Sequence, residues 1–193
     1  NELLQQVHQT SEDANFGSPT LSLSYGIHYI YVVASRGTGA TVSIPDETIV
    51  FGRVLDTFWG CYTMTVDAAT DNTHNIRHDR AVTKLKVTFT DAIPDNVATF
   101  NVTPATWYYG LNFVTGNPVE AVNDQPFVIN VPSSSIGVSG VAVNIFGFSS
   151  STEWTTDVEV SSKKSNGDVI SSVTLSDAPF KRNRVTEYSG TMW

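Results

Sequence analysis

The chain has 193 residues, of which 40% are hydrophobic and 16% charged, so it can form a real core and carries too little charge for a disordered chain. Its formal net charge of -8 argues against nucleic acid as a partner, because proteins that bind phosphate backbones normally present a clustered basic face. The one cysteine, Cys61, excludes an intramolecular disulfide.

The first part of the chain predicts one short helix and then strands. An apolar stripe favours a helix within residues 1–14. "LSLSYGIHYIYVV" follows, with apolar side chains at every odd position from 21 to 33, which predicts a long strand with one buried face. Cys61 lies in the apolar run "FWGCYTMTV", so we expect a buried, unreactive thiol. Three shorter strands are predicted at 41–44, 48–55 and 58–67.

A polar segment at residues 67–79, "DAATDNTHNIRHD", separates two regions of alternating sequence. We therefore predict one domain at 1–79 and a second at 80–193. The first domain has only four candidate strands, and a sheet of that size is marginal on its own. We expect it to lean on the second domain, or to lack a strand that lies upstream of Asn1 or belongs to another chain.

The second region is richer in strands. "RAVTKLKVTFT" alternates between apolar and polar side chains, and the pair Asn166 and Gly167 predicts a hairpin turn within "EVSSKKSNGDVISSV", because both residues tolerate positive φ. Further strands are predicted at "ATFNVT", "WYYGLNFV", "PFVINV", "SGVAVNIFGF" and the closing tail. Many short strands at close spacing predict an all-β protein, a sandwich or a barrel of antiparallel sheets.

Few residues suggest chemistry. His74 and His78 are four apart, with Asp71 and Asp79 beside them, and on a helix they would offer two metal ligands on one face. The segment is rich in loop-forming residues, so a plain surface loop is the favoured interpretation. The serine-rich stretch 133–140 lacks the turn that positions a nucleophile. We predict no catalytic, cofactor-binding or metal-binding residues, and a protein that is not an enzyme.

Three neighbouring aromatic residues are the candidate binding residues. Alternation along a strand would turn Trp107 and Tyr109 to one face and Tyr108 to the other. An exposed ring on a β surface can stack on a sugar or anchor a protein interface. The competing interpretation places two of the rings in the core and the third under a loop.

The tail, "PFKRNRVTEYSGTMW", carries three cations within four residues. Neither face of this segment is continuously apolar, so we predict a terminal strand on a sheet edge, where charges discourage unwanted pairing. We expect Arg182 and Arg184 to pair with carboxylates, and Met192 and Trp193 to bury the end of the chain.

The order of several motifs resembles the Bacteroidetes fimbrial subunit (fimbrillin-like) family, and most closely its minor, anchor or accessory subunits. In "HDRAVTKLKVTFTDAIPDNVATFNVT" an arginine and a small-apolar pair open a strand, preceded by "YGIHYIYVVASRG" and "FWGCYTMTV". The tail carries the basic-Asn-basic, Thr, Tyr-x-Gly-x-apolar-aromatic ending at Arg182, Asn183, Arg184, Thr186, Tyr188, Gly190, Met192 and Trp193. The similarity covers most of residues 20–193.

The resemblance implies two tandem transthyretin-like β-sandwich domains, export as a lipoprotein and display at the outer membrane. It implies strand donation between subunits, so the expected partners are other fimbrial subunits, or host or bacterial surface proteins, with glycans as a further class. No cofactor is implied. The chain begins with Asn1 instead of Met, so we expect a removed leader or an excised fragment.

A secreted carbohydrate-binding module is the alternative function. It would use Trp107, Tyr108, Tyr109 or Trp154 as stacking platforms. Binding to a glycan array that is lost on Trp107→Ala would favour this alternative over an adhesive or structural role.

Overall fold

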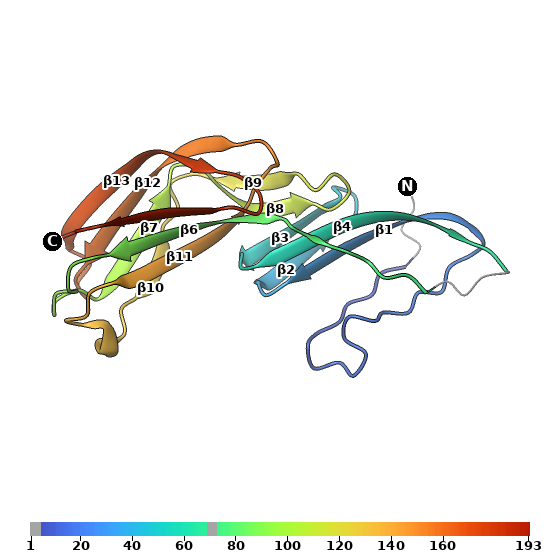
Figure 1. Ribbon diagram of the computed structural model, residues 1–193, viewed down its shortest axis with the longest axis horizontal. Coiled ribbons are helices and arrows are strands. Elements are labelled where there is room, and N and C mark those ends of the chain that lie inside the picture. The colour runs from blue at the N-terminus through green and yellow to red at the C-terminus, as the bar shows by residue number, and fades with distance from the viewer. Residues whose placement is uncertain (1–4, 69–72) are drawn as a thin grey trace.

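The computed structural model describes residues 5–68 and 73–193 of an elongated, nearly all-β molecule (Figure 1). Its strands form four sheets. In the first sheet, the order is β1 (Gly26–Ser35), β4 (Thr57–Val66) and β5 (Asp79–Arg80). In the second sheet, the order is β2 (Thr38–Ser43), β3 (Thr48–Arg53), β8 (Trp107–Asn112) and β9 (Pro118–Val122).

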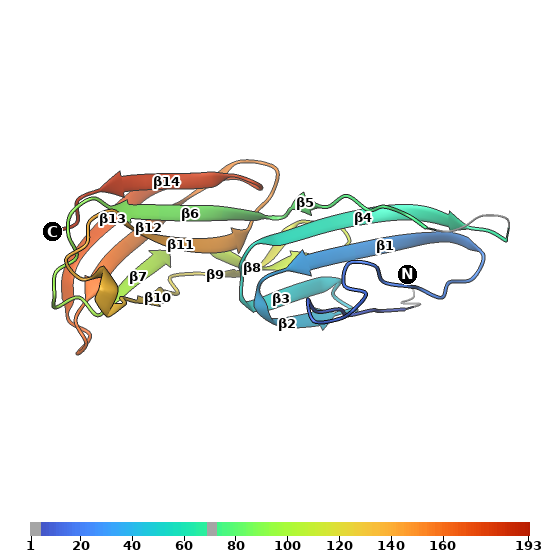
Figure 2. The ribbon, with the colours of Figure 1, turned by 60° about the horizontal axis from the view of Figure 1, so that its bottom comes forward.

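The other two sheets lie at the opposite end of the molecule (Figure 2). In the third sheet, the order is β11 (Val141–Phe148), β6 (Val82–Phe89) and β14 (Val185–Gly190). In the fourth sheet, the order is β10 (Phe127–Asn130), β7 (Thr99–Pro104), β12 (Trp154–Lys163) and β13 (Val169–Phe180). One 3₁₀ turn, η1 (Ser133–Ser135), precedes β11.

The third and fourth sheets enclose the main core. Alternation along β6 buries Leu85, Val87 and Phe89, as predicted from its sequence. The ring of Phe89 stacks on Phe100 of β7, with centroids 4.4 Å apart, and so joins the two sheets. The predicted hairpin is confirmed, because β12 pairs with β13 in antiparallel fashion around the turn that contains Gly167.

A smaller core, built from the second and third sheets with Val33 and Trp59 of the first sheet packed against it, crosses the predicted domain boundary. β3 pairs with β8 through Ile49 and Leu111. Buried residues from both sides of position 79 pack in this cluster: Phe51, Val54, Ala81, Val82, Leu111 and Phe148. Early strands therefore lean on later ones, and the division into separate domains stays a prediction.

The predicted N-terminal helix is wrong for the residues that the structure describes. Residues 5–10 have no regular secondary structure, and turns follow at 11–17. Asp13 accepts a hydrogen bond from the backbone N–H of Thr10, and Gln9 donates to the carbonyl of Asn15. Such bonds offer the backbone an alternative to the helical pattern. Within residues 5–68 and 73–193, no helix is long and apolar enough to span a membrane.

The tail forms a terminal strand on a sheet edge, as predicted. β14 pairs in parallel with β6 and lies at the end of the strand order of the third sheet. Met192 is 8% exposed, and the Trp193 ring lies 5.7 Å from that of Phe89 and 6.2 Å from that of Phe100. The chain end is therefore buried against the main core.

The expected pairing of the tail arginines with carboxylates is wrong. The salt bridges between described residues join Arg80 to Asp56 and Lys86 to Glu187. Arg182 instead donates hydrogen bonds to backbone carbonyls. A guanidinium has five donors, so carbonyl oxygens can satisfy it without an ion pair.

Candidate functional surface

One half of the inner face of β1 is uncovered. Tyr31 and Val33 pack toward the second sheet, and the Tyr31 ring lies 5.9 Å from Phe113. Tyr25, just before the strand, and Ile27 and Tyr29 are 75%, 66% and 60% exposed. The prediction of a fully buried odd face is therefore wrong for this half of the segment.

Strand length explains the difference. β1 and β4 each have ten residues, whereas β2 and β3 each have six. At about 3.3 Å per residue, the facing strands are roughly 13 Å too short to cover the whole ribbon. In Figure 1 the β1–β4 ribbon runs on beyond β2 and β3.

The same face continues onto β4. In the register of the two strands, Tyr29 lies opposite Thr63 and Ile27 opposite Thr65, and both threonines are exposed. Cys61, opposite Tyr31, is also exposed, so the predicted burial of this thiol is wrong. We name the exposed side chains of Tyr25, Ile27, Tyr29, Thr63 and Thr65 the bare face.

The ribbon carries no Asp, Glu, Lys or Arg in either β1 or β4. This is unusual in a chain with a net charge of -8, and depletion of charge is typical of the centres of protein interfaces. The pKa of the Tyr31 phenol is raised, first by burial and then by the nearby Cys61. Tyr31 thus marks the place where the covered core gives way to the bare face.

The opposite face of the ribbon is covered. His28 is 8% exposed, and its Nε2 lies 2.8 Å from the carbonyl oxygen of Ser24. The ring of Tyr62 on β4 meets that of His78 edge-on, at 6.2 Å. Among the described strands, β1 pairs only with β4. β1 therefore has one free backbone edge next to the bare face.

The three aromatic residues singled out in the sequence do not form an exposed platform. Trp107 is 1% exposed, and its indole N–H donates to the carbonyl of Phe146 at 3.0 Å. Tyr108 meets Trp154 edge-on at 5.4 Å. Tyr109 stacks on Phe127 at 5.6 Å, and burial raises the pKa of its phenol. A binding role for Trp107, Tyr108 and Tyr109 stays a prediction, with Trp107 closed to any stacking ligand.

The histidine segment forms no described metal site. His74 is exposed, residues 73–78 have no regular secondary structure, and Asp71 lies outside the described residues. Within residues 5–68 and 73–193, no three His, Cys, Asp or Glu side chains are grouped so that they could hold a metal ion. The serine-rich stretch contains η1 and otherwise irregular backbone.

Comparison with known proteins finds a similar fold but no matching family model. No family model matches the chain, and no curated protein matches it. A solved structure of a putative adhesin from Bacteroides ovatus ATCC 8483 matches with a TM-score of 0.53 and 12% identity over 80% of this chain. The two folds are similar. The chain spans 66% of that adhesin's length.

A second putative adhesin from Bacteroides ovatus matches with a TM-score of 0.47 and 12% identity, covering 86% of this chain and 68% of that one. The likeness at 12% identity concerns fold alone, so the role of the bare face is argued from its own residues. One sequence feature signals that face: neither β1 nor β4 contains Asp, Glu, Lys or Arg.

Proposed function

We propose that this chain is a non-enzymatic cell-surface subunit or adhesin of fimbrial type, which acts through β-strand pairing and surface contacts. The observation that carries the proposal is the bare face beside the free edge of β1. Its three large side chains, with 75%, 66% and 60% exposure, present on the order of 400 Å² of largely apolar surface. The largest apolar patch on a soluble monomer typically has ~300–600 Å² and is often functional.

An added β-strand fits this surface. Its backbone would pair with the free edge of β1, and its alternate side chains would lie on the same face as Ile27 and Tyr29 and pack against them from the side. The strand would extend the first sheet and bury part of the bare face from its side. Free strand edges beside an apolar face are otherwise an aggregation hazard that proteins avoid.

The similarity in fold to an adhesin supports a place at the cell surface. The fimbrial assignment, the outer membrane and a lipid anchor in the precursor follow from the sequence resemblance and are part of the proposal. The partners would be other fimbrial subunits, or surface proteins of a host or another bacterium.

A single charge on the bare face tests the proposal in cells that export the full-length precursor. Tyr29→Lys should leave folding intact, because Tyr29 is 60% exposed, but it would place a charge against the apolar side chains of the added strand. We expect at least a tenfold loss of the protein from high-molecular-mass assemblies sheared from the cells, measured by immunoblot.

Val169→Lys is the matched control, because Val169 is 56% exposed on β13, away from the ribbon. Assembly of this variant should equal that of the wild type. If Tyr29→Lys assembled as well as the wild type, the bare face would not be the surface through which the subunits assemble. Wild-type protein found only as a monomer on the cells would overturn the fimbrial proposal.

A further inference from the structure

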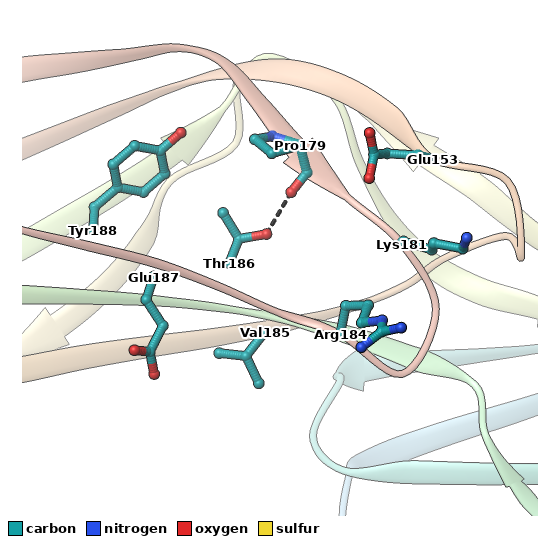
Figure 3. A pocket seen from close by; sticks show the side chains of 8 residues that line it. All are labelled: Glu153, Pro179, Lys181, Arg184, Val185, Thr186, Glu187 and Tyr188. Atoms are coloured by element: carbon teal, nitrogen blue, oxygen red, sulfur yellow. Dashed lines mark hydrogen bonds between the residues drawn. The ribbon is translucent and has the colours of Figure 1, made fainter.

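A cleft of about 610 Å³ lies between the end of β13 and the start of β14, beside the turn that joins them (Figure 3). The two strands are the outer strands of different sheets. Across the cleft, the hydroxyl of Thr186 donates to the carbonyl of Pro179 and holds the strands together.

The joining turn brings two cations to one end of this cleft. Asn183 adopts a left-handed φ of 58°, and the N–H of Arg184 donates to the carbonyl of Lys181 at 3.2 Å. Figure 3 shows the side chains of Lys181, Arg184 and Glu153 at the turn end of the cleft, and the ring of Tyr188 toward the other end.

The lining carries two cations and two carboxylates, so it is neutral until the partner of Glu187 is counted. Glu187 is already paired with Lys86, at 3.2 Å. The other charged residues of the lining are Lys181, Arg184 and Glu153. Two cations therefore face one carboxylate, in a protein whose formal net charge is -8. The cleft attracts an anion locally, while the surface as a whole repels one.

The carboxylate of Glu153 favours anions that also carry hydroxyl groups over anions that do not. It repels a bare anion, but it accepts hydrogen bonds from hydroxyl groups. The half-buried ring of Tyr188 adds an apolar surface against which a ring of CH groups can pack. The lining thus fits a ligand that combines a negative charge, hydroxyls and an apolar ring face.

We propose that this cleft binds an acidic sugar whose negative charge is a carboxylate. The guanidinium of Arg184 would bind the carboxylate through two N–H groups, and Lys181 would supply a second positive charge. Glu153 would accept from the sugar hydroxyls, and Tyr188 would pack against the ring. The site is separate from the bare face and does not depend on strand pairing.

Titration of the ¹⁵N-labelled chain with galacturonate tests the proposal, with galactose and sodium sulfate as comparison ligands. We expect galacturonate to shift the amide signals of Lys181–Tyr188 and to bind at least tenfold more tightly than galactose. Arg184→Gln should weaken galacturonate binding at least tenfold. Arg36→Gln, an exposed arginine between β1 and β2, should leave it unchanged.

Three results would overturn the assignment: no shift with galacturonate, equal binding of galactose, or equal shifts with sulfate. Both variants should keep the wild-type melting temperature, so that a loss of binding reports on the cleft. A short oligosaccharide that ends in galacturonate distinguishes the source of the sugar. Tighter binding than the free sugar points to a surface glycan, and equal binding points to the free acid.

Discussion

At the scale of single residues, Arg182 connects three parts of the chain. Its guanidinium donates to the carbonyl of Ser149 at 3.0 Å and to that of Gly116, and it lies 5.8 Å over the ring of Trp59. Burial lowers the pKa of Arg182, and the carboxylate of Asp79 partly offsets this. An arginine stays charged in proteins, so these are charge-assisted bonds between early and late segments.

We expect Arg182→Gln to lower the free energy of unfolding by about 2 kcal/mol, because hydrogen bonds to charged groups contribute ~1.5–3 kcal/mol. Denaturant unfolding measures this loss. Arg184→Gln, two residues away and exposed, should change it by less than about 0.5 kcal/mol. Equal losses in the two variants would show that the contacts of Arg182 contribute nothing specific.

Asp91 ties down the end of the chain. Its Oδ2 accepts the backbone N–H groups of Met192 and Trp193, at 2.9 and 2.7 Å. Burial alone would raise the pKa of Asp91, but hydrogen bonds from Trp193, Met192 and its own N–H together lower it below the ordinary 3.8. The stabilisation is therefore complete above the unfolded pKa and is lost as the pH falls through the lower, folded value.

We predict that Asp91→Asn lowers the melting temperature at pH 7 and has less effect as the pH falls below the ordinary value of 3.8. The neutral amide accepts the two N–H groups more weakly than the carboxylate does. Melting curves of both proteins at pH 7 and near pH 3 measure the gap. A gap of the same size at both pH values would rule out this carboxylate as a charged anchor.

Single residues also show which contacts and which burial the local sequence does not predict. No local pattern around Trp107 predicts that Phe146, from a distant strand, accepts its N–H. Cys61 has apolar neighbours in sequence but is exposed. Its burial depends on how far the facing sheet reaches, which local composition does not encode.

Among the elements, β11 lies so close to β8 at Gly147 that no side chain fits between the two strands at that position. A Cβ at Gly147 would lie 2.4 Å from Nε1 of Trp107. Trp107 is fully enclosed, since its ring meets Phe180 edge-on at 5.0 Å and Trp154 at 6.1 Å. The glycine thus sets the distance between the two strands.

Gly147→Ala should therefore destabilise the protein by about 1–3 kcal/mol, the usual cost of overpacking a core. Gly190→Ala is the matched control, because Gly190 also lies in a strand and a Cβ there would meet nothing within 4 Å. Thermal unfolding compares the two. Equal melting temperatures of the two variants would mean that Trp107 moves aside for the added methyl group without loss of stability.

Elements with a complete local signal were predictable. β6 shows its buried face by alternation, and the β12–β13 hairpin shows its turn by Asn166 and Gly167. The parallel pairing of β14 with β6 joins residues about a hundred positions apart. Nothing in either strand specifies the partner, because backbone pairing is common to all sequences.

In the molecule as a whole, the two ends differ in how fully their facing sheets cover each other. The third and fourth sheets cover each other around the stacked pair Phe89 and Phe100. The first sheet is only partly covered, so Tyr25, Ile27 and Tyr29 stay exposed. The shortage of strands in the first region was predictable from the sequence, whereas the location of the bare face required the register of β1 and β4.

Hydrogen exchange along β1 tests whether this strand accepts a strand from a partner. In the purified full chain, the β1 amides that point away from β4 should exchange rapidly, because that edge has no strand partner among the described residues. In assemblies sheared from the cell surface, the same amides should be protected by an added strand. Equal exchange in the free and assembled protein would contradict the claim that β1 accepts a strand.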